Sequence, residues 1–170
     1  EKNIETSKKG QYRIKDNFLA FWFRFVYPMR SFIESDHPEI AMTKLKTGFI
    51  PNHVGYVYED ICRQKMWELN AQGKLPFLFD RVGRWWGGKD TEIDIVAIDT
   101  TDRSKIIFGE CKFHQNVPMQ LSELHQLKEK AAVVPWGNAN RDEYFALFCI
   151  SGYSEDLQQL AQEDSHLLLM

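Results

Sequence analysis

Two short acidic motifs place titratable side chains at strand spacing in the middle of the chain. The first is Glu92-Ile-Asp94, and the second is Glu110-Cys-Lys112, which begins sixteen residues after Asp94. Side chains alternate between the two faces of a strand, so Glu92 and Asp94 share one face, and Glu110 and Lys112 share one face of the next strand. If the two strands pair as a hairpin with these faces in common, three carboxylates and one ammonium group meet on one surface.

Carboxylates packed this closely repel one another, and their pKa values rise unless a cation neutralises them. Mg²⁺ suits such a group because it is a hard ion that prefers oxygen ligands and keeps several of its waters. Lys112 would then orient, or help to deprotonate, a water for in-line attack on phosphorus. The alternative is a surface salt bridge across a hairpin, which contributes little to stability.

Hydrophobic periodicity predicts the elements that must hold these residues. Apolar residues recur every three or four positions from Val54 to Ala71, which predicts a helix with one buried face. The period then changes to that of strands, and the predicted order from there is α-β-β-β-α-β-α-β. This order predicts an α/β fold with a mixed sheet of about five strands flanked by helices. The predicted strands cover 75–86, 91–99, 105–113, 144–151 and 167–170, and the later helices cover 118–133 and 154–163.

Residues 1–50 differ in pattern from the rest of the chain, and we expect a domain boundary after them. Asp16 is the expected N-cap of an apolar, aromatic run from Phe18 to Tyr27. So many large apolar groups predict a helix that is buried on most sides or docked on another module. At about ten residues the run is too short to span a bilayer, which needs roughly 20 residues. Residues 35–50 are predicted to form a linker.

The overall composition is that of an ordinary globular domain. The chain has 170 residues, with 21 Lys and Arg and 24 Asp and Glu, which gives a formal net charge of −3. This charge argues against a protein that binds nucleic acid by bulk charge alone, although it leaves room for a local basic groove. The three cysteines lie far apart and form no CxxC pair, which indicates a reducing, cytoplasmic setting without a disulfide framework. We expect no membrane partner.

Asp94 together with Glu110-Cys-Lys112 resembles the PD-(D/E)xK nuclease superfamily, whose core is the restriction-endonuclease-like fold. The resemblance implies that Asp94 and Glu110 bind Mg²⁺ (or Mn²⁺) and that Lys112 serves the attacking water. It also implies an extra acidic metal ligand on the preceding helix, for which Glu59 is the candidate. The proline that gives the superfamily its name is missing, because Ile93 stands before Asp94.

A second resemblance covers nearly the whole chain. The stretch from Tyr12 to Phe25 is similar to the segment after the winged helix in a family of archaeal and bacterial AAA-type ATPases. Those proteins carry a C-terminal domain of unknown function with phrases similar to Gly83-Arg-Trp-Trp, Glu-x-Asp and Gly109-Glu-Cys-Lys. The resemblance implies that residues 1–50 are the tail of a winged-helix module with the aromatic helix and a linker. It implies that residues 51–170 are a PD-(D/E)xK nuclease-like domain.

These patterns together predict a Mg²⁺-dependent deoxyribonuclease that forms the C-terminal module of an ATPase. The expected catalytic residues are Asp94, Glu110, Lys112 and Glu59. The expected partners are DNA and the ATPase and winged-helix modules of the parent chain, with a second copy of the chain as an optional partner. The chain has no GxxxxGK[ST] phosphate loop, so we expect no ATP hydrolysis by this chain alone.

Two alternatives stay open. The first is a non-catalytic module that binds DNA or a protein, regulates the ATPase and keeps a relic nuclease site. The second is an assembly domain that uses the aromatic run at 18–27 to form oligomers.

Overall fold

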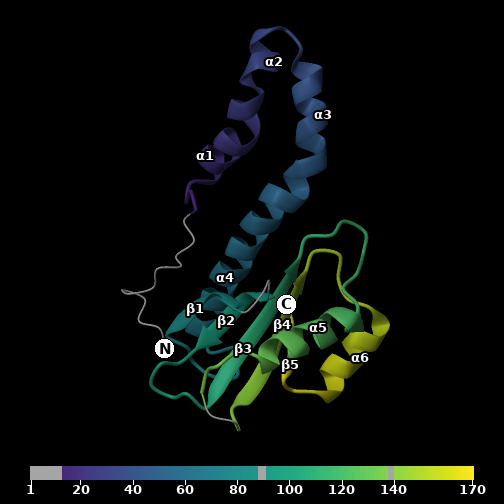
Figure 1. The fold of residues 1–170 in the computed structure, drawn as a ribbon. Helices are drawn as coiled ribbons and strands as arrows, with labels where there is room; N and C mark the ends of the chain where they lie inside the picture. The colour runs from purple at the N-terminus through teal and green to yellow at the C-terminus, as the bar shows by residue number, and fades with distance from the viewer. Residues whose placement is uncertain (1–12, 88–90, 138–139) are drawn as a thin grey trace. The chain divides into compact units, whose positions relative to one another are not determined.

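The computed structural model of the chain describes residues 13–87, 91–137 and 140–170 (Figure 1). The chain divides into two compact units, one that ends at His53 and one that runs from Val54 to Met170. The division falls close to the boundary expected after residue 50.

The second unit is built on a mixed sheet that has five strands among the described residues, in the order β1-β2-β3-β4-β5. β1 pairs with β2, and β2 with β3, in antiparallel fashion, whereas β3, β4 and β5 run parallel to one another. The structure confirms the predicted α/β class and the mixed five-stranded sheet, and it is compatible with a restriction-endonuclease-like core. The strands are β1 Arg81–Gly87, β2 Thr91–Ile98, β3 Lys105–Lys112, β4 Asp142–Cys149 and β5 Leu167–Leu169.

Helices cover both faces of this sheet (Figure 1). α4 (Gly55–Ala71) packs on one face, where its buried Cys62 and Met66 join residues of β2, β3 and β4 in one part of the core. α5 (Leu121–Ala132) and α6 (Glu155–Glu163) pack on the other face and complete a second part of the core. Because both faces are covered, β3 and β4 are buried over most of their length, as the nearly continuous apolar run in β4 predicts.

The first strand begins later than its sequence pattern predicts, at Arg81 rather than at residue 75. Pro76 lies in the irregular segment before β1. Its missing N–H group interrupts no hydrogen bonds between strands there. Asn70, buried in the last turn of α4, holds this segment in place. Its amide donates to the Phe79 carbonyl at 3.0 Å, and its side-chain oxygen accepts from the Phe79 N–H at 3.1 Å. Asn70 therefore fixes the path from α4 into the sheet.

The first unit is a series of short helices. Asp16 is the N-cap of α1 (Asn17–Phe21), as predicted, because its side chain accepts a hydrogen bond from the Leu19 N–H at 2.8 Å. Where we expected a linker at 35–50, the structure has α3 (Pro38–Phe49), and Pro38 occupies the first turn, where its missing N–H needs no partner. The other elements are two π-helices, η2 Trp22–Val26 and η4 Ile50–Val54, the 3₁₀-helix η3 Tyr27–Met29, and the α-helix α2 Arg30–Glu34.

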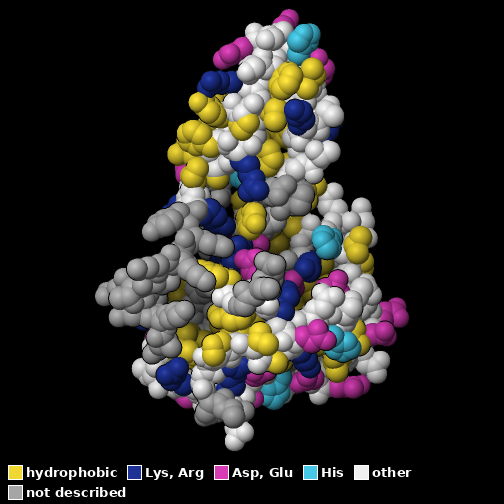
Figure 2. Space-filling model, in the orientation of Figure 1, with side chains coloured by type: hydrophobic (Ala, Val, Ile, Leu, Met, Phe, Trp, Pro, Cys, Tyr) yellow, Lys and Arg dark blue, Asp and Glu magenta, His cyan; other side chains and the backbone are white. Residues whose placement is uncertain are grey.

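Aromatic rings pack against one another inside this unit. The centroids of Phe21, Phe25, Phe49 and His53 lie 5.6–6.1 Å apart, and burial lowers the pKa of His53. No described residue of the aromatic run is buried within this chain, so burial on most sides is not found; Phe21 and Phe25 are half-buried. Figure 2 shows hydrophobic side chains gathered on the visible face of this unit, and the exposed aromatic residues of the run are Phe18, Trp22, Phe23 and Tyr27. In the described ranges, no helix has both the length and the hydrophobicity to cross a membrane.

Replacing Asn70 with alanine leaves the backbone groups of Phe79 without their partners. We expect the free energy of unfolding to fall by about 2–3 kcal/mol, because each buried polar group left unpaired costs about 1–3 kcal/mol. Urea denaturation followed by circular dichroism measures this loss. Gln72→Ala, an exposed change just past the end of the same helix, is the control and should shift stability by less than about 0.5 kcal/mol. Equal effects of the two changes would contradict the assigned role of Asn70.

Candidate active site

An extra residue in β2 sets the direction of Asp94. Gly83 of β1 pairs with Val96, and Trp85 pairs with Ile93, so a step of two residues in β1 matches a step of three in β2. Such a β-bulge interrupts the regular alternation of side chains and redirects one of them. Asp94 lies within the bulge, between the two regular parts of the strand.

The bulge sends consecutive odd-numbered residues of β2 to opposite faces of the sheet. Ile93 packs in the part of the core under α5, whereas Ile95 packs in the part under α4. Ile95 faces Gly109 of β3 in the last pair of these two strands, and a Cβ atom at Gly109 would lie only 2.9 Å from that of Ile95. Beyond this pair, a side chain takes the place of a backbone carbonyl as the acceptor for β3. Oδ2 of Asp94 accepts a hydrogen bond from the Cys111 N–H at 2.9 Å.

Glu110 is a buried carboxylate that faces two lysines. Its side chain is 8% exposed, its Oε1 lies 2.7 Å from Nζ of Lys112, and its Oε2 lies 3.0 Å from Nζ of Lys130. Lys112 comes from the same strand, whereas Lys130 comes from the last turn of α5. A buried carboxylate needs such partners to stay charged. The helix on this face therefore supplies one cation and the strand supplies the other.

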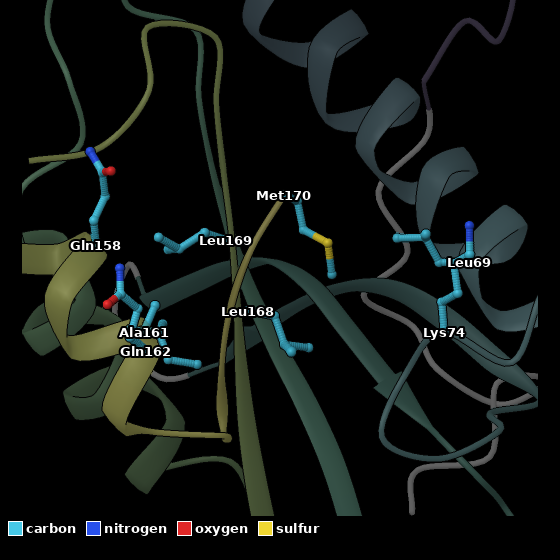
Figure 3. A pocket seen from close by; sticks show the side chains of 9 residues that line it. Leu69, Lys74, Gln158, Ala161, Gln162, Leu168, Leu169 and Met170 are labelled. Atoms are coloured by element: carbon cyan, nitrogen blue, oxygen red, sulfur yellow. The ribbon is translucent and has the colours of Figure 1, made fainter.

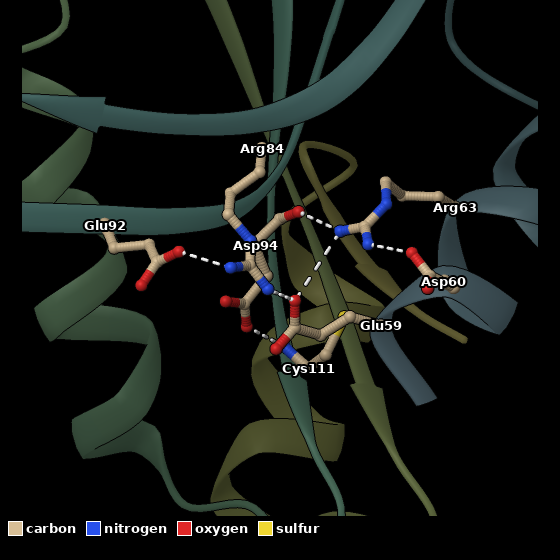
Figure 4. A network of polar contacts seen from close by, with 7 residues as sticks. All are labelled: Glu59, Asp60, Arg63, Arg84, Glu92, Asp94 and Cys111. Atoms are coloured by element: carbon tan, nitrogen blue, oxygen red, sulfur yellow. Dashed lines mark hydrogen bonds and ion pairs between the residues drawn. The ribbon is translucent and has the colours of Figure 1, made fainter. Parts of the chain in front are cut away.

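Glu59 of α4 is also neutralised by two cations (Figure 4). Its carboxylate pairs with Arg84 of β1 and lies 3.6 Å from Arg63, which follows one helical turn later. Arg84 also binds Glu92 at 2.8 Å, and Arg63 donates a hydrogen bond to the main-chain carbonyl of Asp94 at 2.9 Å. This network ties α4 and β1 to the backbone of the bulge.

Asp94 differs from Glu59, Glu92 and Glu110 in having no ion pair among the described residues. Burial raises its pKa, and the charge of Glu110 raises it further, from 3.8 to about 6. The hydrogen bond from the Cys111 N–H and the charge of Lys112 act in the opposite direction and do not cancel this effect. Among the described residues, no Lys, Arg or His side chain forms an ion pair with Asp94.

Lys112 and Cys111 differ in what they can do chemically. Burial lowers the pKa of Lys112, but the charge of Glu110 and its hydrogen bond raise it overall, so the side chain is an ammonium donor at neutral pH. The hydrogen bond with Cys62 and burial raise the pKa of the Cys111 thiol, which disfavours the thiolate form. Cys111 packs against the core under α4, as strand alternation predicts for a residue between Glu110 and Lys112.

The carboxylates at the site form a pair rather than a metal cage. In the part of the chain that the structure describes, no three His, Cys, Asp or Glu side chains form a group that could hold a metal ion. A cation between Asp94 and Glu110 would therefore take its remaining ligands from water or from a substrate.

A pocket of about 560 Å³ lies elsewhere, along β5 (Figure 3). Its walls are mainly apolar and come from β5, from α6 and from the end of α4, with Lys74 as the one charged residue among the described lining side chains. A single ammonium group without a carboxylate offers neither a metal site nor an acid–base pair. The chemistry that the sequence predicts therefore belongs to the Asp94 region and not to this pocket.

The structure places three of the predicted site residues together, namely Asp94, Glu110 and Lys112. Glu59 lies close enough for its charge to contribute to the raised pKa of Asp94, although its own partners are arginines. Its role as a metal ligand stays a prediction. Glu92 pairs with Arg84 at the exposed end of the network.

Sequence reasoning missed Lys130, and it placed Arg63 and Arg84 in a basic cluster between residues 60 and 89 without pairing them with carboxylates. Arg63 stands four residues after Glu59, and this helical spacing is a signal that could have identified it. Lys130 and Arg84 carry no such signal, because the fold brings them to their partners from other elements.

Comparisons with known proteins cover all of these residues. A family model described as archaeal and bacterial proteins of unknown function (DUF234) matches residues 22–131, which is more than half of the chain. An uncharacterised protein of Methanocaldococcus jannaschii is 35% identical over 142 residues, which cover 83% of this chain and 31% of the relative. The aligned region thus spans about a third of the length of that curated relative. No solved structure matches the chain.

Asp94→Asn is expected to stabilise the protein above pH 6. Between pH 4 and 6 the folded state binds a proton at Asp94 that the unfolded state has already lost, so wild-type stability falls as the pH rises through this range. Removing the charge should therefore raise the free energy of unfolding at pH 7.5 by up to about 3 kcal/mol, at about 1.4 kcal/mol per pKa unit. The gain should vanish near pH 4.

Urea denaturation at pH 4 and at pH 7.5, in chelator-treated buffer, tests this expectation. Glu129→Gln removes an exposed carboxylate from α5 and serves as the matched control, with little change at either pH. A loss of stability in Asp94→Asn that is the same at both pH values would contradict the electrostatic account.

Proposed function

The chain belongs to a family of archaeal and bacterial proteins of unknown function, and for it we propose Mg²⁺- or Mn²⁺-dependent hydrolysis of DNA phosphodiester bonds. One observation carries the proposal. The partly buried carboxylate of Asp94 lies beside Glu110, while the nearby cations bind the other carboxylates. The proposed catalytic residues are Asp94, Glu110 and Lys112, with Glu59 in a supporting role.

A divalent cation is the counter-charge that best fits Asp94. A partly buried carboxylate next to a second one lowers the stability of the fold, and groups of this kind are concentrated at functional sites. Asp94 and Glu110 offer hard oxygen ligands, and Mg²⁺ at phosphoryl-transfer sites is typically held by one or two carboxylates, waters and phosphate oxygens. The carboxylate pair fits this mode of binding.

The side chains around Asp94 have distinct roles in the proposed reaction. When bound, Mg²⁺ would stabilise the negative charge that develops as water attacks phosphorus. Lys112, as an ammonium group, would hold the attacking water or a phosphoryl oxygen by a hydrogen bond, and Glu110 positions it at 2.7 Å. Glu59 would keep Arg63 in place, and Arg63 holds the main-chain carbonyl of Asp94.

DNA is the proposed substrate because cations surround the carboxylates. Arg63, Arg84, Lys112 and Lys130 come from four elements, and Lys and Arg are among the side chains that contact DNA phosphates. The resemblance to PD-(D/E)xK nucleases supports the same substrate. The alignment leaves more than half of the curated relative outside it, which is room for the ATPase and winged-helix modules of a cytoplasmic parent protein.

A second candidate is a non-catalytic module that binds DNA or a protein and regulates the ATPase. The ion pairs favour it, because Glu59 and Glu110 are already neutralised by arginines and lysines of the protein itself. In this account the carboxylates are the relic of a nuclease site, and the cations around them bind a partner.

Cleavage of single-stranded, double-stranded and branched DNA in Mg²⁺ or Mn²⁺ tests the first proposal. We expect the wild-type chain to cleave at least one of these substrates, and a chelator to abolish the cleavage. Lys112→Ala should reduce the rate by about 10²–10³-fold, as expected for the loss of one group that stabilises the transition state. Lys105→Ala, at the other end of the same strand, is the matched control and should cleave at the wild-type rate.

Absence of cleavage with both ions on every substrate would contradict the nuclease proposal. DNA binding that survives Asp94→Ala without any cleavage would support the regulatory module instead.

A further inference from the structure

We propose that Lys130 is a second substrate-binding lysine of this site and contacts a phosphodiester oxygen of DNA. The inference rests on the proposed function and extends the site to α5, which carries none of the motif residues.

The geometry around Glu110 is the first argument. Lys112 and Lys130 bind different oxygens of the same carboxylate, at 2.7 and 3.0 Å, so the two ammonium groups flank it. Their side chains are 28% and 30% exposed, whereas that of Glu110 is 8% exposed. Both lysines therefore reach solvent from which a substrate would approach. Each ammonium group has three N–H donors, so a bond to Glu110 leaves donors for a phosphate oxygen.

The balance of charge is the second argument. Glu110 carries one negative charge, and Lys112 on the same strand provides one positive charge. Lys130 is a second cation on that carboxylate, whereas Glu59 and Glu92 pair with arginines. If the charge of Glu110 is shared with a divalent ion, the Lys130 ammonium loses part of its partner. A phosphodiester oxygen is the anion that the proposed substrate supplies in its place.

The alternative explanation for Lys130 is purely structural. A lysine in the last turn of a helix interacts favourably with the helix dipole, and this contribution needs no ligand. Lys128 of the same helix provides the comparison, because its ammonium lies over the ring of Phe145 at 5.2 Å and not at Glu110. If Lys130 contacts the substrate, replacing it weakens DNA binding more than replacing Lys128. If only the positive charge of α5 matters, the two replacements have the same effect.

Binding of fluorescein-labelled duplex DNA to the 170-residue chain tests the proposal. Anisotropy is measured over a series of salt concentrations in Ca²⁺, which fills oxygen sites. We expect Lys130→Met to weaken binding roughly tenfold, the range for a hydrogen bond to a charged group. The slope of log K against log[salt] should fall by about 0.9, the value for one phosphate contact. Lys130→Arg should keep both the affinity and the slope, and Lys128→Met should match the wild type.

The outcomes separate this inference from the proposed function. If Lys130→Met and Lys130→Gln, both shown to be folded by circular dichroism, bind with the affinity and slope of Lys128→Met, the phosphate contact is wrong even if Lys112-dependent cleavage is observed. If the slope falls as expected but no variant or wild-type chain cleaves DNA, Lys130 binds phosphate and the nuclease proposal fails. If the wild-type chain does not bind duplex or single-stranded DNA, the inference is overturned.

Discussion

Two carboxylates, on neighbouring strands of a sheet that is covered on both faces, constrain the structure of a large part of the second unit. Asp94 and Glu110 lie where helices pack on both faces, and charge in such a place is unfavourable unless it is paired. The protein brings cations to this point from both sides of the sheet, Arg63 from α4 and Lys130 from α5. These cations bind Glu59 and Glu110, so the excess negative charge remains at Asp94. A site that lowers stability in this way is typical of a binding or catalytic function.

Small irregularities of the strands create this arrangement. The bulge in β2 moves Asp94 out of regular alternation, and Gly109 allows β2 and β3 to approach closely just before they separate. The Asp94 carboxylate then accepts the Cys111 N–H that a regular strand would have bonded. The geometry of the site therefore depends on backbone features that a change of one side chain at some distance can disturb. Asn70, at the end of α4, fixes the chain just before it enters β1.

The sequence predicts the sheet well because its strands are either alternating or continuously apolar, and both patterns follow directly from burial. It also predicts that Asp94, Glu110 and Lys112 meet, since their motifs lie on two strands joined by a short connection. It does not predict the bulge in β2, and it does not identify Arg84 as the partner of Glu92. α3 was expected as a linker because Pro38 suggests a break, although a proline also suits the first turn of a helix. The contact of Lys130 with Glu110 depends on how α5 packs on the sheet, and no pattern in the sequence predicts it.

We propose above all that Asp94 and Glu110 together bind a divalent cation. Isothermal titration of the wild-type chain with Mn²⁺, at pH 7.5 and without DNA, tests it most directly, with Asp94→Asn and the control Glu129→Gln measured in parallel. Our account predicts one Mn²⁺ site in the wild type and in Glu129→Gln, and its loss in Asp94→Asn. Equal Mn²⁺ binding by Asp94→Asn and the wild type, or no binding by either, would contradict the account.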